Sequence, residues 1–222
     1  MEKRVEHTCP HCGNKFEITI YPVINLQSDE HLYKDLFSLD LFKIKCSKCK
    51  KVTLIQYDMF VIDMFKKYII NLYVTKDVSK FIYNKSSLIE SLTSNPAYKD
   101  VLSKIKYTRI VTSLNELLEK LLIFDYDLND KLIEIMKLSI SDKDRIDKLL
   151  YTNICFDKLE RDELLFTCFN INDKKVSPVQ MGINVKYYNT VIDMVDGIPE
   201  EKEMFMLVNK DWATNQVNVT NI

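Results

Sequence analysis

Alternating apolar and polar positions dominate the first third of the chain. Residues 15–24 place apolar side chains at every second position before Pro22 interrupts the pattern, which predicts a half-buried strand that ends at an edge or a break. Three further segments have strand composition: residues 41–45, 52–57 and 68–74. Together they predict an antiparallel sheet of about four strands, with residues 58–67 as a turn or short helix.

A short amphipathic segment separates the first two of these strands. Ser28, Asp29 and Glu30 have the composition of a helix start, because acidic residues there lie at the positive end of the helix dipole. Apolar residues then recur at helical spacing as far as Leu39. The pattern predicts one helix inserted between the strands.

The apolar spacing becomes helical beyond Ser86. Short helices are predicted over residues 87–92 and 96–105, and Ser113 forms a capping box with Glu116 ahead of a longer apolar stripe. Three further helices are predicted over residues 130–140, 141–154 and 157–169. These segments predict a helical second half.

Strand-like composition returns near the C-terminus. Residues 183–194 and 204–208 flank a turn-forming segment that contains Gly197 and Pro199. This arrangement predicts a C-terminal β-hairpin with a long turn.

The composition is that of an ordinary globular protein. The chain has 222 residues, of which 46% are hydrophobic, and these supply a sizeable core. A polar stretch at residues 76–86 marks the predicted boundary between a domain of residues 1–80 and a region of residues 81–222. The two parts could also pack as one unit.

The charge balance gives no global reason to bind nucleic acid or an acidic membrane, since the net charge is −1. The chain begins with charged and polar residues, and no apolar run approaches the length of a membrane span. We therefore expect a cytoplasmic protein with no membrane partner.

Two Cys-x-x-Cys pairs, here called knuckles, carry the clearest chemical signal. The first consists of Cys9 and Cys12, and the second of Cys46 and Cys49. In a reducing compartment such pairs indicate a metal site, not disulfides, and four thiolates complete a tetrahedral Zn²⁺ shell. The sequence therefore predicts a structural zinc site.

This site defines the predicted fold class, which is α+β. A zinc-ribbon-like antiparallel sheet with an inserted helix is followed by a helical half and a C-terminal β-hairpin. The knuckles lie about twice as far apart as in a usual ribbon, which agrees with the inserted helix. The second knuckle has Lys50 where the first has Gly13, and Ser47 where the first has Pro10, so we expect it to form the less favourable turn.

No catalytic constellation is visible in the sequence. A closed four-cysteine shell leaves no open position for substrate, and only three glycines occur, too few for a phosphate-binding loop or a dinucleotide fingerprint. Cys155 and Cys168 lie among apolar residues and are expected to be buried. The chain is interpreted as non-catalytic, with an enzyme site between its two halves left as an alternative.

Basic residues cluster around the second knuckle. They are Lys43, Lys45, Lys48, Lys50 and Lys51. Such lysines could contact nucleic-acid phosphates, and Phe42 or Tyr57 could stack on a base. The alternative is a solvated strand face and a solubilised knuckle, which is the preferred interpretation. The candidate nucleic-acid-binding residues are Lys45, Lys48, Lys50 and Lys51.

The motifs around both knuckles resemble the CpXC domain, named for its Cys-Pro-x-Cys knuckle. The matching segments are Thr8–Gly13, Asn25–Asp29, Leu41–Phe42 ahead of Cys46–Cys49, Tyr57–Met59 and Arg109–Lys120. The resemblance covers about residues 8–140 and departs at Ser47, where proline is common. The resemblance implies a bacterial zinc-binding domain. It does not imply a particular activity, because the family has no established one.

Three functional hypotheses follow, in order of preference. The first is a non-catalytic zinc-binding module that mediates protein–protein interaction or regulation in a bacterial cell. The second is a nucleic-acid-binding protein that uses the lysine-rich second knuckle. The third is an enzyme with a site between the two halves.

Overall fold

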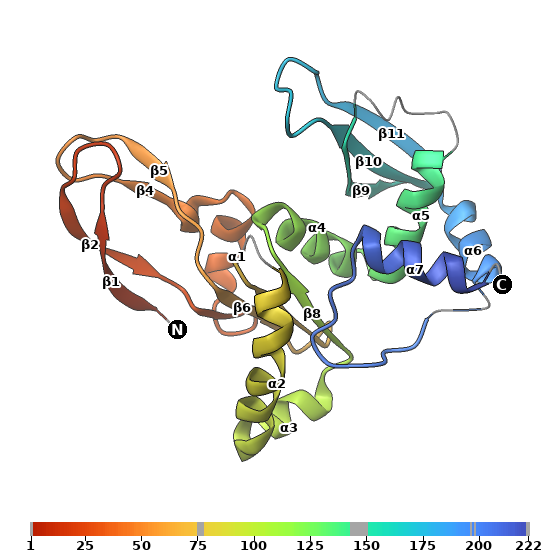
Figure 1. Ribbon diagram of the computed structural model, residues 1–222, viewed down its shortest axis with the longest axis horizontal. Coiled ribbons are helices and arrows are strands. Elements are labelled where there is room, and N and C mark those ends of the chain that lie inside the picture. The colour runs from red at the N-terminus through yellow and green to blue at the C-terminus, as the bar shows by residue number, and fades with distance from the viewer. Residues whose placement is uncertain (1, 75–77, 143–150, 196, 198, 221–222) are drawn as a thin grey trace. The chain divides into compact units, whose positions relative to one another are not determined.

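The computed structural model describes residues 2–74, 78–142, 151–195, 197 and 199–220 (Figure 1). Its architecture is α+β, as the sequence predicts. Two compact units occur: the first comprises Met1–Leu117 with Glu203–Met206, and the second comprises Leu118–Lys202 with Leu207–Ile222. The boundary proposed near residue 80 stays a prediction.

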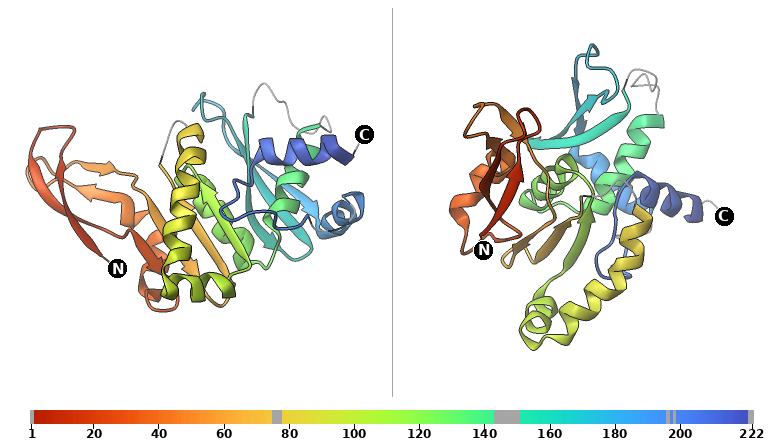
Figure 2. Two further views of the ribbon diagram at one scale, coloured as in Figure 1. Left: turned by 60° about the horizontal axis from the view of Figure 1, so that its bottom comes forward. Right: turned by 60° about the vertical axis from the view of Figure 1, so that its left-hand side comes forward.

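Two antiparallel hairpins carry the knuckles in the first unit. Strands β1 (Lys3–Thr8) and β2 (Lys15–Ile20) form one, and β4 (Lys43–Lys45) and β5 (Val52–Leu54) form the other. Both project from the same end of this unit (Figure 2). The break expected at Pro22 lies between β2 and the short strand β3 (Val23–Asn25).

A separate four-stranded sheet forms the core of the first unit. Its order is β3-β6-β7-β8, with β6 at Met59–Asp63, β7 at Tyr68–Leu72 and β8 at Tyr107–Val111. Strands β3 and β6 are parallel, as are β7 and β8. The predicted strands are thus present but do not form one antiparallel sheet, and the turn expected over residues 58–67 contains β6.

The inserted helix is confirmed as α1 (Glu30–Phe37). It buries Leu32 and Leu36, which stand four residues apart and so lie on one helical face. A 3-10 turn at Asp40–Phe42 then leads into β4. The helix thus connects the sheet to the second hairpin.

Four helices occupy the segments that the sequence predicts, but strand β8, which was not predicted, lies between the second and the third of them. The helices are α2 (Val78–Ser94), α3 (Pro96–Lys104), α4 (Leu114–Asp125) and α5 (Asp130–Asp142). Half of the predicted capping box is present, because the backbone N–H of Glu116 donates to Ser113 Oγ at 3.3 Å. The Glu116 carboxylate accepts from Thr112 N–H at 2.6 Å, one residue before Ser113. The helix predicted over residues 87–92 is the second half of a longer one.

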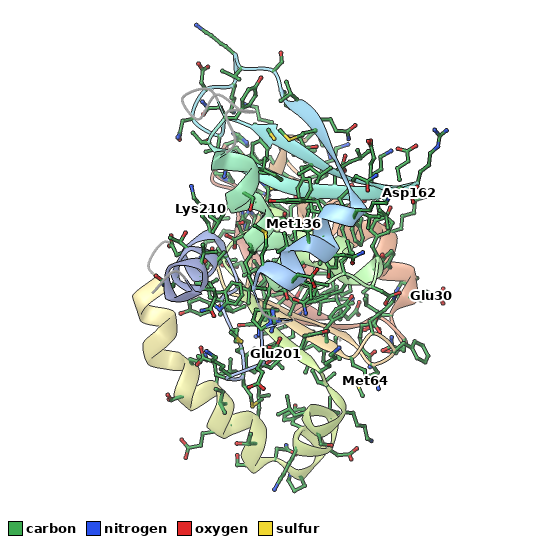
Figure 3. All side chains as sticks on the ribbon, turned by 90° about the vertical axis from the view of Figure 1, so that its right-hand side faces the viewer. Glu30, Met64, Met136, Asp162, Glu201 and Lys210 are labelled. Carbon is green, nitrogen blue, oxygen red and sulfur yellow. The ribbon has the colours of Figure 1, made fainter. Side chains whose placement is uncertain are left out.

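The C-terminal hairpin sheet is confirmed, but other residues form it. Strands β9 (Asn153–Glu160), β10 (Glu163–Phe169) and β11 (Val179–Asn184) pair antiparallel, and Asp162 marks the first turn in Figure 3. The helix predicted over residues 157–169 is therefore wrong, because Leu164, Phe166 and Cys168 are buried at every second position.

Two further predictions in this region also differ from the structure. The helix expected over residues 141–154 falls largely on residues 143–150, which lie outside the described residues, and its last two residues begin β9. Residues 185–194, expected to be a strand, form α6 (Val185–Met194). Asn184 favours the start of this helix, since its side chain accepts from Lys186 N–H at 3.0 Å as an N-cap.

The last segments are α7 (Lys210–Thr220) in the second unit and a short return to the first. Met206 forms a parallel bridge with Arg109 of β8 instead of the expected hairpin strand. Across the described residues, no helix combines the length and apolar character needed to cross a bilayer.

Candidate metal centre

The first knuckle occupies the turn between β1 and β2. The backbone N–H of Cys9 donates to the carbonyl of Asn14, and the N–H of Gly13 donates to the carbonyl of Cys9, both at 2.9 Å. Gly13 has φ of 68°, a left-handed conformation that glycine adopts without a Cβ penalty. Local turn chemistry therefore holds Cys9 and Cys12 on one side of the loop.

The second knuckle repeats this geometry between β4 and β5. The N–H of Cys46 donates to the Lys51 carbonyl at 2.9 Å, and the N–H of Lys50 donates to the Cys46 carbonyl at 3.0 Å. Lys50 stands in the glycine position with φ of 61°, and a left-handed conformation costs a non-glycine residue about 1–2 kcal/mol. This agrees with the expectation that the second turn is the less favourable one.

The hairpins bring all four knuckle sulfurs together, within 4.8 Å of one another. Cys9 Sγ lies 3.7 Å from Cys49 Sγ, and Cys12 Sγ lies 3.7 Å from Cys46 Sγ. A tetrahedral zinc ion with bonds of about 2.3 Å to sulfur requires edges of about 3.8 Å, whereas a disulfide bond is only about 2 Å long. The cluster could therefore hold a metal ion.

The four side chains differ in exposure. Cys9 and Cys46, the first residue of each knuckle, are buried, while Cys12 and Cys49 are partly exposed. One hydrogen bond also joins the two knuckles directly, from Asn14 Nδ2 to Ser47 Oγ at 3.2 Å. Serine in place of proline thus gives the second knuckle a polar contact with the first.

Backbone donors tune the thiols unequally. The N–H groups of Cys49 and Lys48 donate to the sulfur of Cys46 and lower its pKa to about 6, against the effect of desolvation. A backbone contact with Asn14 acts to lower the pKa of Cys12, but desolvation and the neighbouring thiols raise it to about 11. A bound cation would offset the repulsion between the neighbouring thiolates and so favour the loss of the Cys12 proton.

The remaining histidine and cysteine candidates for metal binding or catalysis are not part of the four-sulfur cluster. His11 is exposed, as expected for a knuckle residue that is not a ligand. Cys168 is buried, as expected, but the same expectation is wrong for Cys155, which is partly exposed. The two lie on paired strands, where Cys155 is opposite Thr167. Within the described ranges, no second group of histidine, cysteine or acidic side chains has metal-binding geometry.

The predicted basic cluster is exposed. All five lysines, Lys43, Lys45, Lys48, Lys50 and Lys51, are exposed to solvent. The aromatic residues nearby have another role, because Phe42 is fully buried and its ring centroid lies 5.3 Å from that of Tyr57. The Tyr57 hydroxyl also accepts from Tyr21 N–H at 3.3 Å. Phe42 is thus core, not a stacking surface.

A family profile matches residues 7–137 of the chain, which is more than half of its length, and describes a CpXC protein. The chain belongs to the CpXC family. The match includes both knuckles of this CpXC chain, the four-stranded sheet and most of α5. No curated protein and no solved structure shows significant similarity to it.

The CpXC match also contains a buried group of charges that sequence reasoning missed. Lys120 Nζ lies 3.1 Å from Asp130 and 3.3 Å from Glu134, and Lys137 Nζ lies 2.7 Å from Glu119 and 3.0 Å from Glu134. Asp130, Glu134 and Lys137 follow one stripe of α5 at spacings of four and three residues. This spacing of opposite charges within an apolar segment is the sequence signal that could have predicted the buried ion pairs.

Burial changes the titration of this group. Desolvation raises the pKa of Glu119, although Lys137 and Lys120 act in the opposite direction. Desolvation also opposes the charge of Lys137, but the carboxylates of Glu119 and Glu134 outweigh it and raise the pKa of Lys137 above its ordinary value. Glu119 Oε1 also accepts from Phe156 N–H at 2.6 Å. The group joins α4, α5 and β9.

Proposed function

We propose that this CpXC chain is a non-catalytic zinc protein in which Cys9, Cys12, Cys46 and Cys49 form a closed structural site. The observation that carries the proposal is the convergence of four sulfurs within 4.8 Å, with two pairs at 3.7 Å. Four thiolates select a soft or borderline metal such as zinc. They also complete its shell and leave no position for a reacting water molecule.

The short strands support a structural role for the metal. Strands β4 and β5 contain three residues each and pair only with one another among the described strands, and an isolated two-stranded hairpin is marginally stable at best. Binding free energy from the metal would become folding free energy for both hairpins. Reduced thiolate ligands also favour the cytoplasmic location that we propose.

A module of this kind would act by presenting a surface, and we propose a protein partner, in an interaction or regulatory role. The nucleic-acid alternative rests on the exposed Lys45, Lys48, Lys50 and Lys51. Its test is charge reversal of Lys48, Lys50 and Lys51 to Glu, followed by retention on polynucleotide at low salt. Unchanged retention would remove this alternative.

The zinc proposal is tested by elemental mass spectrometry combined with thiol titration. We expect one zinc per chain and four thiols that become reactive only after a chelator removes the metal. Cys9→Ser should lose the zinc, because a neutral hydroxyl replaces a thiolate ligand. Cys155→Ser is the matched control and should retain it. Iron, substoichiometric metal or freely reactive knuckle thiols would contradict the proposal.

A further inference from the structure

The outer face of the β4–β5 hairpin combines lysines with exposed aliphatic side chains. In the antiparallel register Lys43 is opposite Leu54 and Lys45 is opposite Val52, so these four side chains share one face. Val52 is 56% exposed and Leu54 is 50% exposed. We call these residues, together with Lys48, Lys50 and Lys51 of the adjacent knuckle, the basic face.

The basic face is not a surface that the hairpin needs for its own packing. The opposite face carries Ile44 and Thr53, which are partly buried. Two aliphatic side chains side by side with half or more of their surface in water are therefore available to a partner. Strand β5 also pairs with β4 alone among the described strands, which leaves its other edge open to an added strand.

The backbone of the hairpin is preorganised. Ile55 N–H donates to the Phe42 carbonyl at 2.8 Å, and Cys46 N–H donates to the Lys51 carbonyl at 2.9 Å. These two bonds close the ladder at both ends of β5. A partner that binds here would lose little additional backbone entropy on the hairpin side.

The charge of this segment selects an acidic occupant. Residues 41–57 contain five lysines and no aspartate or glutamate. Lys43 is paired with Asp40 at 2.8 Å, and the Lys50 ammonium donates to the Ser47 carbonyl at 2.7 Å. Lys45, Lys48 and Lys51 are exposed. A positive surface of this kind attracts and orients an anionic partner.

The apolar content decides between the two anionic classes. Single-stranded nucleic acid is held by aromatic rings that stack on its bases, and residues of the basic face include no aromatic side chain. Valine and leucine instead bury aliphatic side chains, which a protein segment supplies. The observations therefore favour an acidic protein segment over a nucleic acid.

We propose that the basic face binds an extended acidic segment of a protein partner, which adds along the open edge of β5. Its aliphatic side chains cover Val52 and Leu54, and its carboxylates lie toward Lys45, Lys48 and Lys51. Backbone pairing supplies affinity and the alternating side chains supply specificity, as in other cases of strand addition. This inference rests on the proposed role as a protein-interaction module and names its surface.

Photo-crosslinking in the host cell tests the surface. The full zinc-loaded chain carries benzoylphenylalanine in place of Leu54 or, in a comparison variant, in place of Phe65, which is 84% exposed on the turn between β6 and β7. We expect the probe at position 54 to crosslink a protein segment that is net negative and contains aliphatic residues. Lys45→Gln should reduce the yield at least fivefold, whereas Lys3→Gln, the same charge change on β1, should not.

The alternatives give distinct results. Crosslinks from position 54 to nucleic acid, to a second copy of this chain or to a segment without negative charge would overturn the inference. Protein crosslinks from position 65 but none from position 54 would also overturn it, while leaving the proposed module intact. The absence of protein crosslinks from both positions would count against the module as well.

A second measurement uses the crosslinked segment as a synthetic peptide. Val52→Thr with Leu54→Thr retains side chains suited to strands but removes aliphatic surface, and we expect the peptide Kd to rise about tenfold or more, the change that about 1.4 kcal/mol produces. Zinc content measured on the same sample shows that the hairpin is intact. An unchanged Kd in a zinc-loaded double variant would overturn the inference.

Discussion

At the scale of single residues, the second knuckle holds a lysine in a backbone conformation that suits glycine. Lys50 and Gly13 occupy equivalent places in two turns with the same hydrogen bonds. The Lys50 side chain donates to the Ser47 carbonyl at 2.7 Å, but it is exposed and so contributes little. The left-handed strain is the larger effect.

Replacing Lys50 with glycine should therefore stabilise the zinc-loaded protein. The expected gain is about 0.5–1 kcal/mol, because relief of the left-handed strain exceeds the added entropy of glycine in the unfolded chain. Thermal unfolding measures the change. Lys48→Gly is the control, since Lys48 has no positive φ, and it should not raise the melting temperature. Equal effects of the two substitutions would contradict this explanation.

The buried charges on α4 and α5 are a second residue-scale feature with a measurable consequence. Lys137→Met would leave Glu119 and Glu134 without their shared cation, and removal of one partner of a buried ion pair costs about 3–5 kcal/mol. Urea unfolding should show this loss. Lys158→Met is the control, because its pair with Glu160 is exposed, and its loss should cost under about 1 kcal/mol.

The same lysine predicts a dependence on alkaline pH. The pKa of Lys137 is raised in the folded state by Glu119 and Glu134, so its stabilising effect is complete below the ordinary lysine pKa and is lost as pH rises through the folded value. Urea unfolding of the parent protein between pH 8 and pH 11.5, minus that of Lys137→Met, isolates the effect. The difference should shrink only above about pH 10, and a constant difference would contradict the assignment.

At the scale of secondary-structure elements, we expect the stability of the two hairpins to depend on the metal that joins their knuckles. Neither β4 nor β5 exceeds three residues, whereas α4 and α5 bury long apolar stripes that include Leu117, Leu121 and Leu132. Chelation of the metal should therefore disrupt the hairpins and leave these helices folded.

Hydrogen exchange measures this difference by region. We expect amides in β1, β2, β4 and β5 to lose protection after chelation, while amides in α5 keep theirs. Readdition of zinc should restore the protection. A uniform loss across both regions, or none in the hairpins, would contradict a site that acts locally.

Elements set by local signals were predictable from the sequence. Each knuckle is a local motif, and Asp29 and Ser113 mark the starts of two confirmed helices. Strand β1 has only Val5 and His7 as half-buried positions, too weak an alternation to recognise. The charged turn at Arg161 and Asp162 lies inside the segment predicted as a helix over residues 157–169, although Arg161 has φ of 54° and the chain reverses there.

Pairing between distant segments was not predictable. Strands β7 and β8 are separated by α2 and α3, and nothing local to Tyr107–Val111 says which strand it joins or that the pairing is parallel. The zinc ligands were the exception, because four cysteines in two Cys-x-x-Cys pairs match the ligand set of one tetrahedral zinc ion. Their proximity could therefore be predicted although the pairs are distant in sequence.

At the scale of the whole molecule, the chain enters the second unit and then returns to the first with four residues. Phe205 is buried in the first unit, where its N–H donates to Thr108 Oγ1 at 2.8 Å and its ring centroid lies 6.2 Å from that of Phe60. Residues 97 positions apart thus contribute to one sheet edge.

Phe205→Ala should destabilise the first unit from this distant position in the sequence. Truncation of a buried phenylalanine typically costs about 3–5 kcal/mol, and exchange should increase at the amides of β8. Met194→Ala is the control, because Met194 is 65% exposed, and it should change neither quantity. Protection in β8 that survives the Phe205 change would show that the returning segment is dispensable.

Because residues 203–206 return to the first unit, the region that matches the family is not the same as the region that folds as a unit. The family match ends at residue 137, yet the backbone of Met206 bonds to Ile110 N–H at 3.0 Å along β8. A truncated protein that ends with the family match would lack residues 203–206. The edge of β8 that these residues cover would then be exposed, and unpaired strand edges promote aggregation. A truncation that preserves the fold of the first unit must therefore keep residues 203–206 together with the family match.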